Sequence, residues 1–134
     1  MKHVYIIDGK RFGSLTEFAG QVSSVFGDPD LWQGNLDAFN DILRGGFGTP
    51  EDGFILRWTH SEQSRQVLGH ESTVAWLEER LKACHPSNVP GLRARLVEAR
   101  RGAGPTLFDE IVEIIRIHGP NGAAHEDGVD LELL

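Results

Sequence analysis

The sequence predicts an α/β fold, a small three-stranded parallel sheet packed by helices. Three short runs rich in β-branched, aromatic or alternating apolar residues have strand character, at residues 3–7, 54–58 and 129–133. The segments between these runs show helical periodicity and are long enough to cross over the sheet, which parallel strands require. We therefore expect right-handed helical crossovers between parallel strands.

The first strand and helix have clear boundaries. Residues 3–7 end at Asp8-Gly9, a typical turn pair, and their continuous apolarity predicts a strand buried on both faces. Ser14 with Glu17 forms a capping-box pattern, and the apolar residues that follow keep helical spacing until Gly27. A helix is therefore predicted from Ser14 to the glycine.

A second helix is predicted after Asn35, a residue type preferred as an N-cap. Leu36, Phe39 and Leu43 fall at i, i+3 and i+7, so they form the buried stripe. The glycine pair at 45–46 ends the helix.

The second half of the chain is mostly helical before the last strand. Glycines, prolines and capping residues divide it into helices expected at residues 61–68, 74–83, 88–101 and 106–118. We expect one domain over residues 1–134, because 134 residues with 40% hydrophobic content suffice for one core.

The charge and cysteine content restrict the class of protein. The net charge of −7 argues against direct nucleic-acid binding and favours a basic protein partner. The single cysteine, the absence of a secretory leader pattern and the lack of an apolar run near the ~18 residues of a membrane span predict a soluble cytoplasmic protein. We expect a monomer when free.

The second helix carries an unusual acidic face. Asp37, Asn40, Asp41 and Arg44 are expected to share its outward side. Asp37 is favoured near the positive end of the helix dipole, whereas Asp41 lies near the C-terminal end and is a like-charge i, i+4 neighbour of Asp37. A position that local rules disfavour indicates a functional role for Asp41.

Three sequence blocks resemble the barstar family of intracellular ribonuclease inhibitors. They are Ile-Asp-Gly at 7–9, Gly-Asn-Leu-Asp-Ala-Phe-Asn-Asp at 34–41, and Trp58 followed by Glu-Gln-Ser at 62–64. The resemblance spans roughly residues 4–68 and resumes over the last helix and strand. It implies a barstar-like fold in which residues 70–105 are an insertion of two extra helices.

The resemblance also implies a partner and a binding site. The partner is a basic, barnase-like ribonuclease of the secreted type or a related toxin nuclease, and the chain acts as its immunity protein. Asp41 is implied to mimic a substrate phosphate, with Asp37 as a neighbouring charge. The remaining implied contacts are Leu31 and Trp32 in the loop, Gly34, Asn35 and Asn40, the rim residues Arg44, Gly45 and Gly46, and Glu113 on the last helix.

Two positions depart from the family pattern. Asn40 stands where the family has an aromatic residue, and Leu31 stands where it has tyrosine. These departures remove stacking contacts, so the nuclease partner is expected to differ from barnase. Of the three tryptophans, Trp58 and Trp76 are expected in the core or at its boundary, and Trp32 is expected to contact the partner.

Other kinds of site receive little support. Asp37 and Asp41 could act as the two carboxylates of a glycosidase only if they lined a cleft, which two neighbours on one short helix seldom do, so we expect no enzyme. Cys84-His85 matches no known metal-ligand spacing, and we expect no metal or cofactor. The glycines at 45–48 follow a helix, the reverse of a phosphate-binding loop. Arginines at 93–101 favour a solvated helix face. The alternative function is a non-catalytic interaction module that uses the same scaffold for another partner.

Overall fold

The computed structural model describes residues 2–45, 49–50 and 52–134 and has an α/β fold. Three strands, β1 (His3–Asp8), β2 (Phe54–Thr59) and β3 (Val129–Leu133), form one sheet in the order β1-β2-β3. Both neighbouring pairs are parallel. The predicted small parallel sheet is therefore confirmed, and each strand lies within one residue of its expected bounds.

The helices follow the predicted order. They are α1 (Leu15–Val25), α2 (Leu36–Leu43), α3 (Ser61–Val67), α4 (His70–Ala83), α5 (Val89–Arg100) and α6 (Leu107–Ile117), with short 3₁₀ turns η1 (Gly9–Arg11), η2 (Pro86–Asn88) and η3 (His125–Asp127). The helix α4 begins four residues earlier than its apolar spacing indicated, because its first turn is polar and is closed by the Thr73 N–H donating to the Gly69 carbonyl at 3.0 Å.

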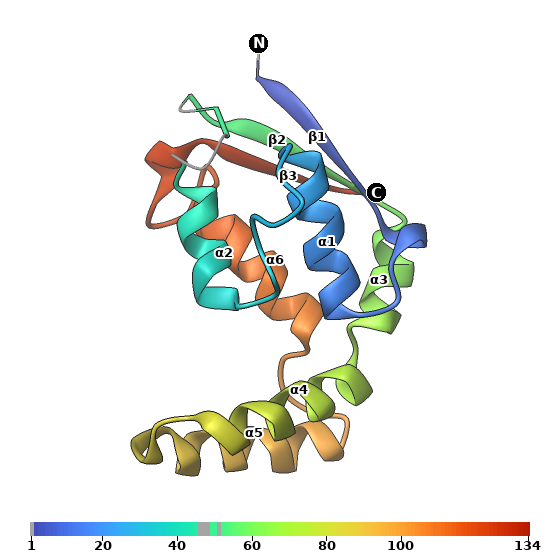
Figure 1. Cartoon of the computed structure of the whole chain (residues 1–134), viewed down its shortest axis with the longest axis vertical. Coiled ribbons are helices and arrows are strands. Elements are labelled where there is room, and N and C mark those ends of the chain that lie inside the picture. The colour runs from blue at the N-terminus through green and yellow to red at the C-terminus, as the bar shows by residue number, and fades with distance from the viewer. Residues whose placement is uncertain (1, 46–48, 51) are drawn as a thin grey trace.

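The sheet is covered mainly on one face, where α1, α2 and α6 pack against it (Figure 1). Along β2, Phe54, Leu56 and Trp58 are buried, while the residues between them are half-buried. The prediction that β1 is buried on both faces was wrong: Ile6 is 52% exposed. The apolar residues of β1 reflect the preference of β-branched side chains for strands, and they do not require that a second layer covers the outer face of the sheet.

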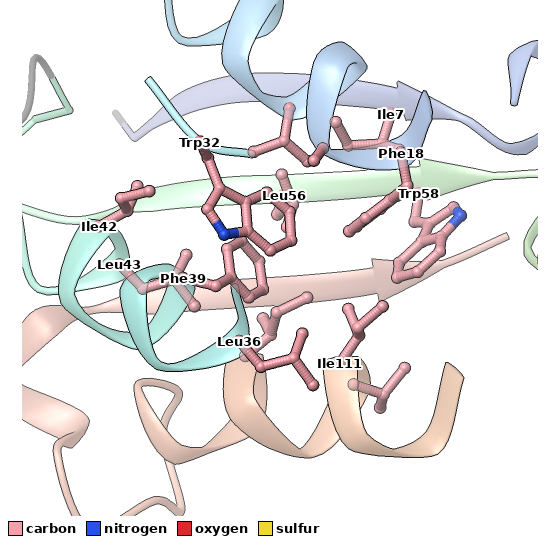
Figure 2. Packing of buried hydrophobic residues seen from close by; sticks show 14 of the residues in the cluster. Ile7, Phe18, Trp32, Leu36, Phe39, Ile42, Leu43, Leu56, Trp58 and Ile111 are labelled. Carbon is pink, nitrogen blue, oxygen red and sulfur yellow. The ribbon is translucent and has the colours of Figure 1, made fainter. Parts of the chain in front are cut away.

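The core is built around two stacked aromatic pairs. Phe18 from α1 stacks on Trp58 from β2 with ring centres 5.0 Å apart, and Trp32 stacks on Phe39 from α2 at 4.6 Å. Figure 2 shows these rings between the helices and the sheet, with Leu36, Ile42 and Leu43 of α2 pointing inward. The acidic helix is thus fixed by its own apolar stripe.

Helices α4 and α5 form a hairpin that extends away from the sheet (Figure 1), and we call residues 70–100 the arm. The arm has its own small apolar cluster, formed by Leu77, Leu92, Leu96 and Ala99. At its base, the Leu107 N–H donates to Thr73 Oγ1 at 2.9 Å, which ties the arm to the start of α6. No helix in the described ranges is long and apolar enough to cross a membrane.

Candidate functional site

The acidic helix α2 begins with a well-formed cap. The side-chain oxygen of Asn35 accepts hydrogen bonds from the backbone N–H groups of Asp37 at 2.8 Å and Ala38 at 3.2 Å. These bonds satisfy two of the free donors at the helix start. The N-cap predicted for Asn35 is confirmed, and its side-chain oxygen is already engaged in the free protein.

Two glycines set the ends of the helix. Gly34 precedes the cap with φ of +110°, and Gly45 follows the helix with φ of +98°. Both values are in the region that residues with a Cβ rarely adopt. The Gly45 N–H donates to the Ile42 carbonyl at 3.1 Å and closes the last turn. Gly46, the second predicted rim glycine, lies outside the described residues.

Asp37, Asp41 and Arg44 are exposed on the outer side of α2, as predicted. The Arg44 Nη1 atom lies 3.9 Å from Asp41 Oδ1, and both side chains are about 60% exposed. A pair with this length and exposure is worth little, so it leaves the Asp41 carboxylate available. Asp37 forms no ion pair with any described residue.

Asn40 does not share this outer face, and the prediction that placed it there was wrong. Its Oδ1 atom lies 2.6 Å from Nε2 of His118, and the side chain is half-buried. His118 follows α6 and is fully buried, and its Nδ1 lies 2.6 Å from a carboxylate oxygen of Asp127. Asn40 is therefore held toward the protein interior by a chain of three polar side chains.

Trp32 also differs from its predicted role as a partner contact. Its side chain is 3% exposed, stacked on Phe39, and its Nε1 donates to the Asn35 carbonyl at 2.6 Å. The indole therefore fixes the loop before α2 and belongs to the core. Leu31 beside it is half-buried and packs against the same core, so it offers part of its surface.

A groove connects α2 to other helices. Leu36 and Asp37 form its wall at the start of α2, and Glu110, Glu113 and Ile114 of α6 line it next to them. The opposite wall is the arm, through Trp76, Arg80, Leu92 and Arg95, and the groove encloses about 320 Å³. The structure thus brings Asp37 and Glu113, two predicted contacts that are 76 positions apart in sequence, to one surface.

The pair formed by buried His118 and half-buried Asp127 was not predicted from the sequence. A histidine at the end of an apolar helix is equally typical of an exposed residue that complements the helix dipole. The tryptophans Trp58 and Trp76 do take their predicted places, the first fully buried and the second half-buried between the two apolar clusters. Among the described residues, no group of three potential metal ligands is close enough to hold an ion.

Comparison with models of protein families shows which family the chain belongs to. The model of a family described as Barstar (barnase inhibitor) matches residues 2–90, which is more than half of the chain. The chain belongs to the barstar family. The matched range includes β1, the complete acidic helix α2, and the first helix of the arm, while α6 and β3 follow it.

Comparison with curated proteins and with solved structures gives no match. Family membership therefore rests on the barstar model and agrees with the strand order and the parallel sheet described above. The family's description supports an inhibitor of a barnase-type ribonuclease at the level of the family.

Proposed function

We propose that this protein is an intracellular inhibitor of a barnase-like ribonuclease, or of a related toxin nuclease, and that α2 blocks the active site of that enzyme. The observation that carries this proposal is the exposed acidic face of α2, which lies within the range that matches the barstar family. No bond is made or broken in this function, because inhibition needs only that the site be occupied.

The chemistry of the helix suits a cationic pocket. A ribonuclease binds the phosphates of RNA through Arg, Lys and His side chains, and a carboxylate accepts charge-assisted hydrogen bonds from the same groups. Asp41 is free to do so because Arg44 screens it weakly at 3.9 Å. We therefore assign Asp41 the role of phosphate mimic, with Asp37 and Glu113 as additional negative charges beside it.

The net charge supports the same pairing. A protein with charge −7 attracts a basic enzyme before contact, and such steering raises the association rate. Fast association matters for an inhibitor that must capture a nuclease before RNA is cut. Because the RNA to be protected is intracellular, we also propose that the protein acts in the cytoplasm, and we propose that it is a monomer when free.

The contact surface differs from the family pattern in its aromatic content. Trp32 is buried, Leu31 replaces tyrosine, and Asn40 is held by His118. Charged groups consequently carry a larger share of this interface than aromatic stacking does. This difference favours a nuclease partner that is distinct from barnase itself.

The test is inhibition of RNA cleavage by a panel of purified barnase-type ribonucleases and toxin nucleases. We expect the wild-type chain to inhibit at least one enzyme and Asp41→Ala to lose most of that inhibition. Glu62→Ala is the matched control, because it removes one exposed carboxylate from α3, which lies away from α2 and from the arm (Figure 1). Equal inhibition by wild type and Asp41→Ala would exclude this role for Asp41, and binding of a non-nuclease partner instead would favour the alternative interaction module.

A further inference from the structure

The charges of this acidic chain are distributed unevenly. Residues 70–105, which comprise the arm and the turn after it, contain six Lys and Arg residues against four Glu. The rest of the sequence contains seven Lys and Arg residues against sixteen Asp and Glu. The arm is therefore a positively charged element on a strongly negative protein.

The arm lies beside the proposed inhibitory surface. The groove that begins at Asp37 and passes Glu113 ends at Trp76 and Arg80 of α4. Figure 1 shows the arm below the body of the protein, on the side where α2 begins. A protein that covers Asp37 and Glu113 consequently meets the arm as well.

Both groove arginines lie over the ring of Trp76, but only one of them pairs with a carboxylate within the described part of the chain. Arg95 pairs with Glu110 through Nη1 and Oε1 at 3.0 Å. Arg80 lies over the ring of Trp76, with its guanidinium carbon 4.9 Å from the ring centre, and pairs with no carboxylate of a described residue. Stacking on an aromatic ring restricts the guanidinium while leaving its N–H donors free. Arg80 is thus an ordered cation at the edge of the groove.

We propose that the arm is a second contact surface for the ribonuclease, and that Arg80, supported by Trp76, binds a carboxylate that the enzyme carries beside its cationic site. This inference rests on the proposed inhibitor function. A uniformly basic enzyme would be repelled by the arm, whereas an enzyme with an acidic patch at this place complements both surfaces. The arm therefore selects among nucleases by penalising those that lack the patch.

A protein carboxylate explains the arm better than a nucleic acid does. Three of its five cations, Lys82, Arg95 and Arg100, already pair with Glu79, Glu110 and Glu78, respectively. This pairing reduces the continuous positive charge that a phosphate backbone would need. A single ordered arginine over an aromatic ring suits one planar carboxylate instead.

The experiment compares Arg80→Glu with Arg93→Glu, using each ribonuclease that the wild-type chain inhibits. Both variants make the same charge change on exposed arginines of the arm, but Arg93 does not line the groove. We expect Arg80→Glu to raise Kd about tenfold or more, through loss of one charge pair and gain of one repulsion. Arg93→Glu should change Kd less than about threefold, because a charge at the rim of an interface acts mainly on the association rate. Thermal unfolding of both variants checks that the arm remains folded, and Arg80→Gln provides a milder second variant.

A reciprocal substitution makes the test specific. Replacing the facing acidic residue of the enzyme with lysine should weaken binding of the wild type and restore binding of Arg80→Glu. Equal effects of Arg80→Glu and Arg93→Glu on Kd, or no effect of either, would refute the arm contact. In that case a loss of inhibition in Asp41→Ala would still support the inhibitor function. Binding of a single-stranded RNA oligonucleotide that both arginine variants reduce would also refute it, in favour of a nucleic-acid surface. Failure of the wild type to bind any enzyme would overturn both proposals.

Discussion

The ring of His118 holds Asn40 at the middle of α2, with Nε2 and Oδ1 2.6 Å apart. The second ring nitrogen faces Asp127 Oδ2 at 2.6 Å, so η3, the end of α6 and α2 are joined through one buried side chain. This link fixes the orientation of α2 one residue before Asp41.

Removing this link should destabilise the protein. We expect Asn40→Ala to lower the free energy of unfolding by about 1–3 kcal/mol, because it leaves a buried ring nitrogen without a partner. Urea unfolding measures this change. Asn121→Ala, at an exposed loop position, is the control and should have almost no effect. A loss no larger in Asn40→Ala than in the control would contradict a structural role for the His118 contact.

Trp32 should behave as a core residue rather than as a partner contact. Trp32→Ala is expected to cost about 3–5 kcal/mol of stability, the range for deleting a large buried aromatic side chain. Trp32→Phe should recover much of this loss but not the hydrogen bond to the Asn35 carbonyl. Calorimetric unfolding distinguishes these cases. If Trp32→Ala folds with wild-type stability but binds the nuclease poorly, Trp32 is a partner contact and not a core residue.

Asp41 should be slightly unfavourable for the free protein. Neutralising it in Asp41→Ala removes a like-charge neighbour of Asp37 and an anion from the C-terminal end of the helix, so stability should rise by roughly 0.5 kcal/mol. Asp37→Ala is the comparison, because the Asp37 carboxylate lies at the N-terminal end of α2, where the helix dipole favours an anion. Its removal should therefore raise stability less than the removal of the Asp41 carboxylate. Thermal unfolding of both variants measures the difference, and a clear stability loss in Asp41→Ala would contradict this reasoning.

The carboxylate of Asp8 should make stability depend on acid pH. The backbone N–H of Lys10 lowers the pKa of Asp8 below its ordinary value, with His60 and Arg11 contributing in the same direction. A lowered pKa in the folded state means that the stabilisation is complete above the unfolded value of 3.8 and is lost as the pH falls through the folded value.

The corresponding experiment compares wild type with Asp8→Asn between pH 5 and pH 2. The wild type should be more stable at pH 5, and the difference should shrink as the pH falls below 3.8. Chemical unfolding at each pH gives the two curves. A difference that stays constant across this range would show that the charge of Asp8 contributes nothing to it.

Local sequence signals predicted most of the fold for identifiable physical reasons. The Ser14 and Thr106 caps are both formed, with Glu17 and Asp109 donating their backbone N–H groups to the hydroxyl oxygens. Such caps depend on residues three positions apart, so they are visible in the sequence. The parallel sheet followed from the long helical connections.

The site was harder to predict, because the contacts that decide the positions of its residues join segments far apart in the sequence. Asn40 is four residues after Leu36 and three before Leu43, so spacing alone places it at the edge of the buried stripe, and its polarity suggested solvent instead. Its partner His118 lies 78 positions away. Trp32 follows a turn, where an aromatic side chain is compatible with either the surface or the core. The groove shared by Asp37 and Glu113 likewise depends on tertiary packing.

We propose that Asp41 contributes more to nuclease binding than any other residue of α2. Truncating one member of a buried, hydrogen-bonded charge pair at an interface costs about 2–5 kcal/mol or more. Such a loss in Asp41→Ala corresponds to a Kd increase from about 30-fold to several thousandfold, mostly through faster dissociation. Asp37→Ala should lose less, because rim charges contribute less than central anchors.

The most direct test is therefore the dissociation constant of wild type, Asp41→Ala, Asp37→Ala and Glu62→Ala with one inhibited ribonuclease, measured at the same salt concentration. We expect the largest loss of affinity for Asp41→Ala, a smaller loss for Asp37→Ala and no loss for Glu62→Ala. An Asp41→Ala variant that binds as tightly as the wild type, or more tightly than Asp37→Ala, would contradict this role of Asp41.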